Sequence, residues 1–212
     1  MTKRLLQAEF LAFYILLPLL IAVALPPRLM FPLLFAMTLV GAVLLHLTPG
    51  FRWPDLVYGW QRIDWRFVLG FTAVTAGVAV VLILLTRPGA FLMLPRHNPE
   101  LMLTIAALYP FLSALPQELI FRPLFFRRYG GLFPPHWGAI LVNACVFAFA
   151  HLMYWNLPAV MLTFAGGVAF AWAYEKQRNF PAAVVLHSLA GIIVFASGLG
   201  IFFYTGMVER PF

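Results

Sequence analysis

The run FVLGFTAVTAGVAVVLILLT, residues 67–86, carries no charged side chain and decides the class of this fold. A helix needs about 20 such residues to cross a hydrocarbon layer roughly 30 Å thick, and this run has that length. The composition of the whole chain is similarly apolar. Of its 212 residues, 63% are hydrophobic and 10% are charged, and the mean hydropathy is +0.93. Ordinary soluble domains carry about 25% charged residues. We therefore predict an all-α protein that is surrounded mainly by lipid.

Further apolar runs of similar length fill most of the chain. They predict a polytopic bundle of about seven transmembrane helices, with six to eight as the limits, in a single integral-membrane domain of residues 1–212. A membrane β-barrel would show shorter segments of alternating hydrophobicity. The first run lacks a small-residue cleavage site and is expected to be a retained span. The predicted spans are 10–25, 30–47, 67–86, 101–124, 137–153, 157–173 and 182–204.

The connections between these runs carry most of the charge. A net charge of +7 would suggest nucleic acid in a soluble protein, but the basic residues lie in short connections, so we expect no nucleic-acid partner. Segment 48–66 mixes charges with Trp and Tyr, as a segment in the headgroup region requires, and 87–100 should be a loop.

The distribution of basic residues predicts the orientation in the membrane. We expect a multi-pass protein of a bacterial cytoplasmic membrane whose amino terminus is cytoplasmic, because the inside connections then hold most Lys and Arg. Splitting the long fourth run would move the carboxyl terminus to the other side. The inside residues would be Lys3, Arg4, Arg52, Arg62, Arg66, Arg127, Arg128, Lys176 and Arg178, and the outside ones Arg28, Arg87, Arg96 and Arg210.

The fourth run contains two ionisable side chains, Glu118 and Arg122. A charge at the bilayer centre costs from about 2.5 to more than 10 kcal/mol, so it persists where it faces protein or a water-filled cavity. Their four-residue spacing places both on one helix face. One interpretation is a purely structural ion pair, which lowers the free-energy cost of placing both charges in the membrane. The other is that both residues belong to a functional site.

Two histidines lie in other spans. Asn143, Phe147 and His151 are four residues apart and share one helix stripe, while His187 follows Pro181 by six residues. A lone histidine in a bundle is more often a satisfied core residue. At 1.5 Å per residue, His151 lies roughly 21 Å from the start of its helix and His187 only about 9 Å from its own, so their depths disagree if both helices start on one side.

Two histidines and a glutamate on three apolar helices can converge in one cavity. There they could polarise a water molecule and stabilise an oxyanion. Alternatively, Glu118, His151 and His187 could bind a divalent metal such as zinc, for which two histidines and one carboxylate are a suitable ligand set.

Three short runs resemble a known family. The runs are QELIFR at 117–122, FAFAH at 147–151 and HSLAG at 187–191. In order and spacing they are similar to the motifs of the CAAX-protease and bacteriocin-processing family of intramembrane proteases, which includes the prenyl-protein endoproteases. Those motifs are two acidic residues and an arginine after three further positions, Phe with His four later, and His with Asn four later. The resemblance covers about 101–191, the expected catalytic core.

The resemblance implies a membrane-embedded endopeptidase with Glu118, Arg122, His151 and His187 in its site. Its substrate would be a peptide or protein that could be lipidated. The chain departs from the pattern at Gln117, which replaces the first acidic residue and is no base, and at Gly191, which replaces the asparagine expected to stabilise the oxyanion.

Those two departures leave alternatives open. Asn143 or Ser188 would have to supply the missing oxyanion donor. A catalytically impaired family member could act instead as a membrane scaffold or a bacteriocin-immunity type of binding protein. A transporter is a third hypothesis, but the two related halves with interrupted helices that are typical of transporters are not found in this sequence.

Overall fold

Seven long apolar helices dominate the part of the chain that the structure describes. The computed structural model describes residues 2–204, 206, 208 and 210. It is 84% helical, and no strand occurs among those residues. The predicted all-α membrane fold is therefore confirmed, and the chain is an integral multi-pass membrane protein. The spans are Lys3–Ala24 (α1 Lys3–Leu11, η1 Ala12–Leu16, α2 Leu17–Ala24), Pro27–His46 (η2 Pro27–Leu29, α3 Met30–His46), Trp65–Thr86 (α4), Pro99–Leu132 (α6 Pro99–Tyr109, η6 Pro110–Ala114, α7 Leu115–Leu119, η7 Ile120–Tyr129, η8 Gly130–Leu132), Trp137–Tyr154 (α8 Trp137–Ala150, η9 His151–Tyr154), Leu157–Glu175 (α9) and Phe180–Ser197 (α10).

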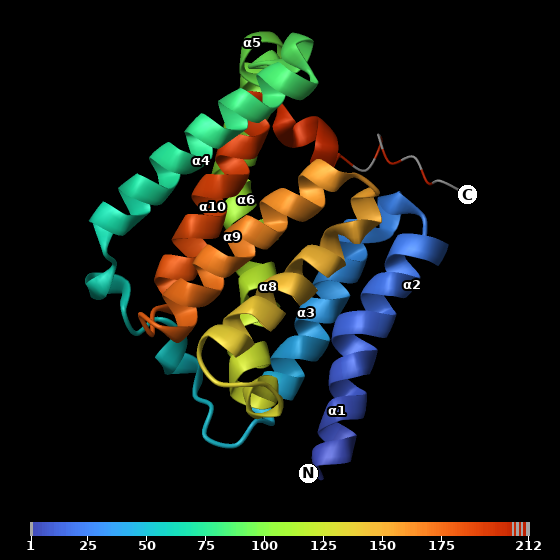
Figure 1. The fold of residues 1–212 in the computed structure, drawn as a ribbon, viewed down its shortest axis with the longest axis vertical. Helices are drawn as coiled ribbons and strands as arrows, with labels where there is room; N and C mark the ends of the chain where they lie inside the picture. The colour runs from blue at the N-terminus through green and yellow to red at the C-terminus, as the bar shows by residue number, and fades with distance from the viewer. Residues whose placement is uncertain (1, 205, 207, 209, 211–212) are drawn as a thin grey trace.

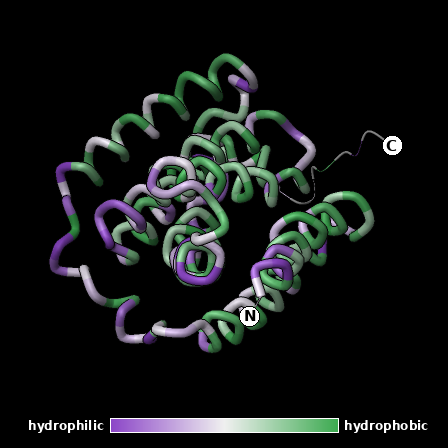
Figure 2. The backbone as a smooth tube through the Cα atoms, turned by 60° about the horizontal axis from the view of Figure 1, so that its bottom comes forward, coloured by the Kyte–Doolittle hydropathy of each residue, from purple (hydrophilic) through white to green (hydrophobic). Residues whose placement is uncertain are grey.

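The spans run up and down through the bundle, so successive connections lie at opposite ends (Figure 1). The helices α8, α9 and α10 pack in sequence order, and α4 covers the other side of α10. The span containing α7 packs between α3 and the later helices. Figure 2 shows the hydrophobic colour along the helices and much of the hydrophilic colour in the connections. The site-bearing span is thereby enclosed by other helices.

An aspartate or asparagine side chain caps the start of four helices, and Thr2 caps α1. An aspartate or asparagine accepts a hydrogen bond from a backbone N–H of the first turn, which has no partner within the helix. Proline also occupies the first turn of α6, α9 and α10, where its missing N–H costs nothing. The capping residues are Asp64 for α4, Asn98 for α6, Asn156 for α9 and Asn179 for α10.

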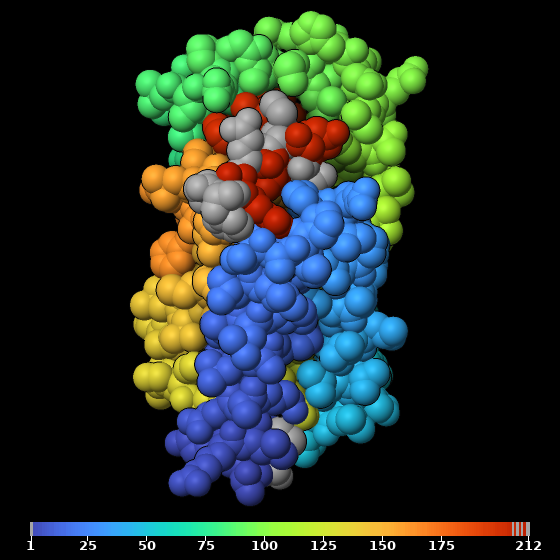
Figure 3. Space-filling view, turned by 90° about the vertical axis from the view of Figure 1, so that its right-hand side faces the viewer, coloured from blue at the N-terminus to red at the C-terminus, as the bar shows by residue number. Residues whose placement is uncertain are grey.

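The outward face of the bundle is apolar, as a lipid-facing surface must be. On α4 the side chains of Leu69, Val74 and Leu85 are exposed, whereas Ala79 and Ile83 are buried against the neighbouring helices. Figure 3 shows another face, where α1 and α2 cover the bundle beside α3. Hydrophobic burial between these helices adds little in lipid, so close packing and polar contacts carry more of the association.

The connections contain short helical turns of their own. The predicted headgroup segment holds the 3-10 turns η3 (Trp53–Leu56) and η4 (Trp60–Arg62), and the predicted loop at 87–100 holds η5 (Pro88–Ala90) and α5 (Met93–His97).

Three predicted span boundaries were wrong by seven or eight residues, and one of them is the end of the fourth span, which lies at Leu132 and not at 124. The first helix starts seven residues earlier than predicted, at Lys3. The last ends at Ser197 because Gly198 has φ +103°, and the backbone carbonyl of Ala90 occupies the place of a side chain there. A 3-10 turn, η10 (Leu199–Phe203), follows it.

The fourth span is a single helix of 34 residues, so the predicted alternative of a split did not occur. Pro110, Pro116 and Pro123 lie within it, and each removes a backbone donor. The helix accommodates them by widening into π-helical segments, η6 and η7, on both sides of the short α7. Such segments often occur at functional sites. Here they bracket the turn that carries Gln117 and Glu118.

Candidate active site

Glu118 and Arg122 form an ion pair that is completely inaccessible to solvent. Arg122 Nε donates to Glu118 Oε2 at 2.8 Å, and both side chains are 0% exposed. The guanidinium also faces the rings of Phe147 and Phe170, at 5.1 and 5.8 Å from their centroids. Removing one partner of such a buried pair is far more damaging than replacing both, because the other charge stays buried and unpaired.

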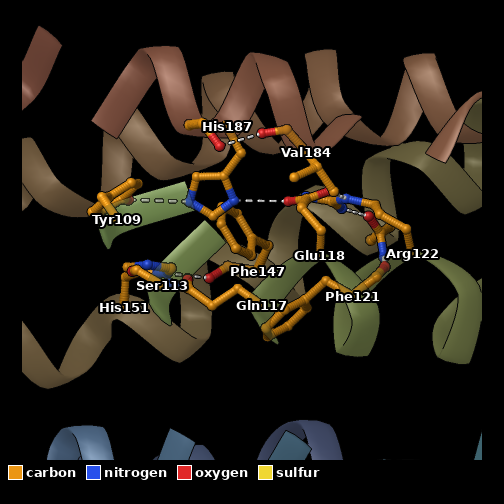
Figure 4. A network of polar contacts seen from close by, with 12 residues as sticks. Tyr109, Ser113, Gln117, Glu118, Phe121, Arg122, Phe147, His151, Val184 and His187 are labelled. Atoms are coloured by element: carbon orange, nitrogen blue, oxygen red, sulfur yellow. Dashed lines mark hydrogen bonds and ion pairs between the residues drawn. The ribbon is translucent and has the colours of Figure 1, made fainter. Parts of the chain in front are cut away.

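His187 connects this ion pair to a second helix, α10. Its Nδ1 lies 2.9 Å from Glu118 Oε1, so the carboxylate is held from α10 as well as from its own helix (Figure 4). The His187 ring stacks on Phe170, with 4.9 Å between centroids and 9° between the planes. A carboxylate oxygen accepts, so a neutral His187 has its proton on Nδ1 and a lone pair on Nε2.

Asn143 braces the ion pair instead of facing the cavity. Its Oδ1 accepts from Arg122 Nη1, and its Nδ2 donates to the backbone O of Phe121 at 2.6 Å. Ser188 likewise uses its hydroxyl, which donates to Val184 O at 2.7 Å. Neither residue offers the spare oxyanion donor that the sequence analysis considered, because local hydrogen bonds already engage both.

His151 reaches the same region from the end of α8. Its Nδ1 lies 2.8 Å from the backbone O of Phe147, so a neutral ring carries its proton there and leaves Nε2 as an acceptor. The Phe147 ring contacts both histidines, with centroid separations of 4.7 Å to His151 and 5.5 Å to His187. Both histidines therefore contact one ring, that of Phe147, although the helix lengths predicted different depths for them.

A cavity of about 380 Å³ brings these groups together. It is bounded by α3, α6, η6, α9 and α10, and its lining is mainly apolar. His151, His187 and Gln117 line it, whereas Glu118 and Arg122 lie behind the wall. His151 and Gln117 also line an adjoining space of about 80 Å³ that reaches α2. The predicted residues thus form two groups, one that faces the cavity and one that holds His187 from behind.

Sequence analysis missed one polar group of this cavity, the hydroxyl of Tyr109. It lies 3.3 Å from His187 Nε2, although the two residues are 78 positions apart. Gln117 Nε2 donates to Ser113 Oγ at 2.9 Å. Tyr109, Ser113 and Gln117 recur every four residues along the span that also carries Glu118, and this polar stripe is the signal that could have indicated them.

The proposed zinc ligands do not form a metal site in this structure. Within the described residues, no three His, Cys, Asp or Glu side chains are grouped to hold a metal ion. Both oxygens of Glu118 already accept from Arg122 or His187, and the adjacent guanidinium would repel a cation. The donor set therefore does not fit zinc, and no catalytic step is assigned to a metal.

A comparison with known protein families finds a match over the segment that contains this site. Residues 99–193 match the model of the family described as type II CAAX prenyl endopeptidase Rce1-like. This stretch is Rce1-like. The resemblance inferred from the three motifs is thus confirmed. No curated protein and no solved structure matches the chain.

The Rce1-like stretch begins at the start of α6 and ends within α10, so it includes every polar residue described above. The family indicates a membrane endopeptidase of the CAAX type that acts on a peptide or protein. The first three spans lie outside the match. They contribute through packing, because α3 lines the cavity and contacts η7.

Proposed function

We propose that the protein is a membrane-embedded endopeptidase whose site consists of Glu118, Arg122, His151, His187 and Gln117. One observation carries this proposal: two histidines from different helices face one cavity, and a buried carboxylate orients one of them. A merely structural ion pair between Glu118 and Arg122 would not require His187 at 2.9 Å from the same carboxylate.

In the reaction, His151 is the general base. Its Nε2 faces the cavity with a lone pair and accepts a proton from a water molecule as the water oxygen attacks the carbonyl carbon of the peptide bond. The C–N bond of the tetrahedral intermediate then breaks, and the same proton passes from His151 to the leaving amine. The products are a carboxylic acid and an amine. Gln117, on the same wall, orients the substrate or the water through its carboxamide.

Glu118 and Arg122 act as positioning residues. Glu118 fixes the ring of His187 and its tautomer, and Arg122 keeps Glu118 ionised and in place. Glu118 is not assigned to attack or to water activation, because its carboxylate does not line the cavity. The opposite charges of the pair cancel, so the substrate meets a site of low net charge.

The substrate class follows from the cavity and the family. The lining is mainly apolar, which favours a peptide segment with hydrophobic side chains or an attached lipid chain. The family description names prenyl-protein cleavage for proteins of this type. We therefore propose a membrane-delivered peptide, and a lipidated one as the specific form to test.

The decisive experiment compares the purified parent with His151→Ala and Glu118→Gln on a library of membrane-anchored peptides. Glu118→Gln keeps the shape of the side chain, so Arg122 retains a hydrogen-bond acceptor. We expect cleavage by the parent and a loss of at least about 100-fold in both variants, and the His151→Ala protein, which keeps the buried ion pair, should elute from a sizing column as the parent does. Cleavage at the parental rate by both variants would refute the assignment.

A second candidate function rests on Gln117. It occupies the first acidic position of the motif, and its amide is engaged with Ser113 instead of serving as a base. A non-catalytic binding protein that keeps the cavity would retain its cellular effect in Glu118→Gln and would show no hydrolysis of any library member. Detection of His151-dependent proteolysis by the purified parent would eliminate this candidate.

A further inference from the structure

The Tyr109 ring packs directly against the backbone of Gly191. An ideal Cβ built on Gly191 would overlap Cε1, Cζ and Oη of Tyr109, so the ring occupies the space of the missing side chain. The two residues come from α6 and α10, which contact each other and both line the cavity. Only glycine at position 191 allows the Tyr109 hydroxyl to lie where it does.

The Tyr109 hydroxyl has a defined hydrogen-bond role at rest. His187 gives its Nδ1 proton to Glu118, so Nε2 of the neutral ring can only accept, and the Tyr109 O–H is its donor at 3.3 Å (Figure 4). A neutral His187 therefore cannot itself donate to a negative oxygen in the cavity. The Tyr109 hydroxyl can, because rotation about its C–O bond redirects the proton without moving the ring.

Two threonine hydroxyls of this cavity are engaged within their own helices. Thr163 donates to Ala159 O at 2.7 Å, and Thr104 donates to Glu100 O at 2.9 Å, both within their own helices. The Gln117 amide donates to Ser113. Tyr109 is thus the hydroxyl of the described cavity lining that is held against the Glu118-linked imidazole.

From this arrangement we infer that Tyr109 is a catalytic residue whose hydroxyl donates to the oxyanion of the tetrahedral intermediate. This inference rests on the proposed peptide hydrolysis. As the water adds, the carbonyl oxygen gains the electron pair of the C=O π bond, and the Tyr109 O–H turns from His187 Nε2 to that oxygen. No proton is transferred in this step. When the carbonyl re-forms and the C–N bond breaks, the hydroxyl returns to His187.

The test is Tyr109→Phe, which removes one oxygen and keeps the ring that fills the gap beside Gly191. Loss of one oxyanion donor typically lowers kcat by about 100 to 1,000-fold, and we expect that loss with KM changed by less than about two-fold. A phosphinate analogue of the cleaved peptide mimics the tetrahedral state, and it should bind Tyr109→Phe more weakly than the parent by a similar factor. Binding of the intact peptide is measured in proteins that lack His151. His151→Ala and the double variant His151→Ala/Tyr109→Phe should bind this peptide with equal affinity.

The matched control is Tyr14→Phe. The Tyr14 hydroxyl is also buried and donates to Ile120 O at 2.6 Å, but it lies outside the cavity lining. This variant should keep the parental kcat.

The outcomes separate this inference from the proposed function. An active parent with an unchanged Tyr109→Phe variant overturns the role of Tyr109 and leaves the peptidase intact. A parent that cleaves nothing overturns the peptidase itself. If Tyr109→Phe and Tyr14→Phe lose activity and thermal stability equally, the hydroxyl of Tyr109 is structural and the inference fails.

Discussion

Arg122 is the largest completely buried side chain in the described part of the protein, and its position explains why charge is tolerated in this bundle. Each guanidinium nitrogen donates a hydrogen bond. Nε and Nη2 donate to the Glu118 carboxylate, and Nη1 donates to Asn143 Oδ1. The aromatic rings around it supply further favourable contact. The polar network is therefore satisfied locally, and its Glu118 end still reaches His187.

Arg122→Ala should lower the free energy of unfolding by about 3–5 kcal/mol, because Glu118 would stay buried without its counter-charge. Thermal unfolding in detergent measures this effect. Lys176→Ala, at an exposed site, should change stability by less than about 0.5 kcal/mol. Equal melting temperatures for the two variants would contradict a central role for the ion pair.

Gly191→Ala should destabilise the protein by about 1–3 kcal/mol and reduce turnover, because the new methyl group must displace the Tyr109 ring. The control is Gly77→Ala in α4, where a Cβ would meet no atom within 4 Å and where alanine favours the helix. Parallel melting and cleavage assays distinguish them. A Gly191→Ala variant as stable and active as Gly77→Ala would show that the ring is not confined there.

At the scale of elements, a second ion pair ties the first helix to the site-bearing span. Arg128 at the end of η7 pairs with Glu9 of α1, and Tyr129 donates to the same carboxylate at 2.5 Å. Arg128 Nη1 also lies 3.3 Å from Leu44 O and from Thr48 Oγ1. The end of η7 thus contacts both α1 and the end of α3. These contacts hold the carboxyl-terminal end of the helix that carries Glu118.

Glu9→Ala should therefore loosen α1 and lower stability by about 1–3 kcal/mol. Limited proteolysis in detergent would reveal faster cleavage near the amino terminus. Glu100→Ala is a suitable control, because Glu100 is exposed in the first turn of α6. If both variants resist protease like the parent, the Glu9 contact does not hold α1 in place.

At the scale of the whole molecule, the seven spans alternate in direction, so the amino terminus lies at the end of the bundle opposite α5 (Figure 1). The same end carries the connection between α9 and α10, where Lys176 and Arg178 lie. The basic residues favour this end as the cytoplasmic one.

This orientation predicts the labelling of single cysteines in intact cells. Both test proteins also carry Cys145→Ser, which removes the native cysteine. The cysteine of Lys176→Cys should react with a membrane-impermeant maleimide only when the cells are opened, whereas that of Arg96→Cys should react in intact cells. The reverse pattern would invert the proposed topology and leave the fold unaffected.

The amino-acid sequence alone was sufficient to assign the membrane class and to indicate candidate residues for the site. Runs of about 20 apolar residues have no stable place outside lipid, and a charged side chain within such a run requires a partner. That reasoning was sufficient to single out Glu118, Arg122, His151 and His187 as candidate site residues, and the pairing of Glu118 with Arg122 followed from their four-residue spacing. Helix ends were less certain, because a single residue such as Gly198 decides where a helix stops.

Which side chains meet across helices depends on how the helices pack, and the sequence did not predict it. The apolar runs carry little hydrophobic periodicity, since lipid and protein neighbours are both apolar, so rotation of one helix against another is not encoded in a simple pattern. For that reason Asn143 was not recognised as the brace of Arg122, and Tyr109 was not connected with Gly191 and His187. Those contacts depend on helix packing and on the wide turns around α7, which no local rule specifies.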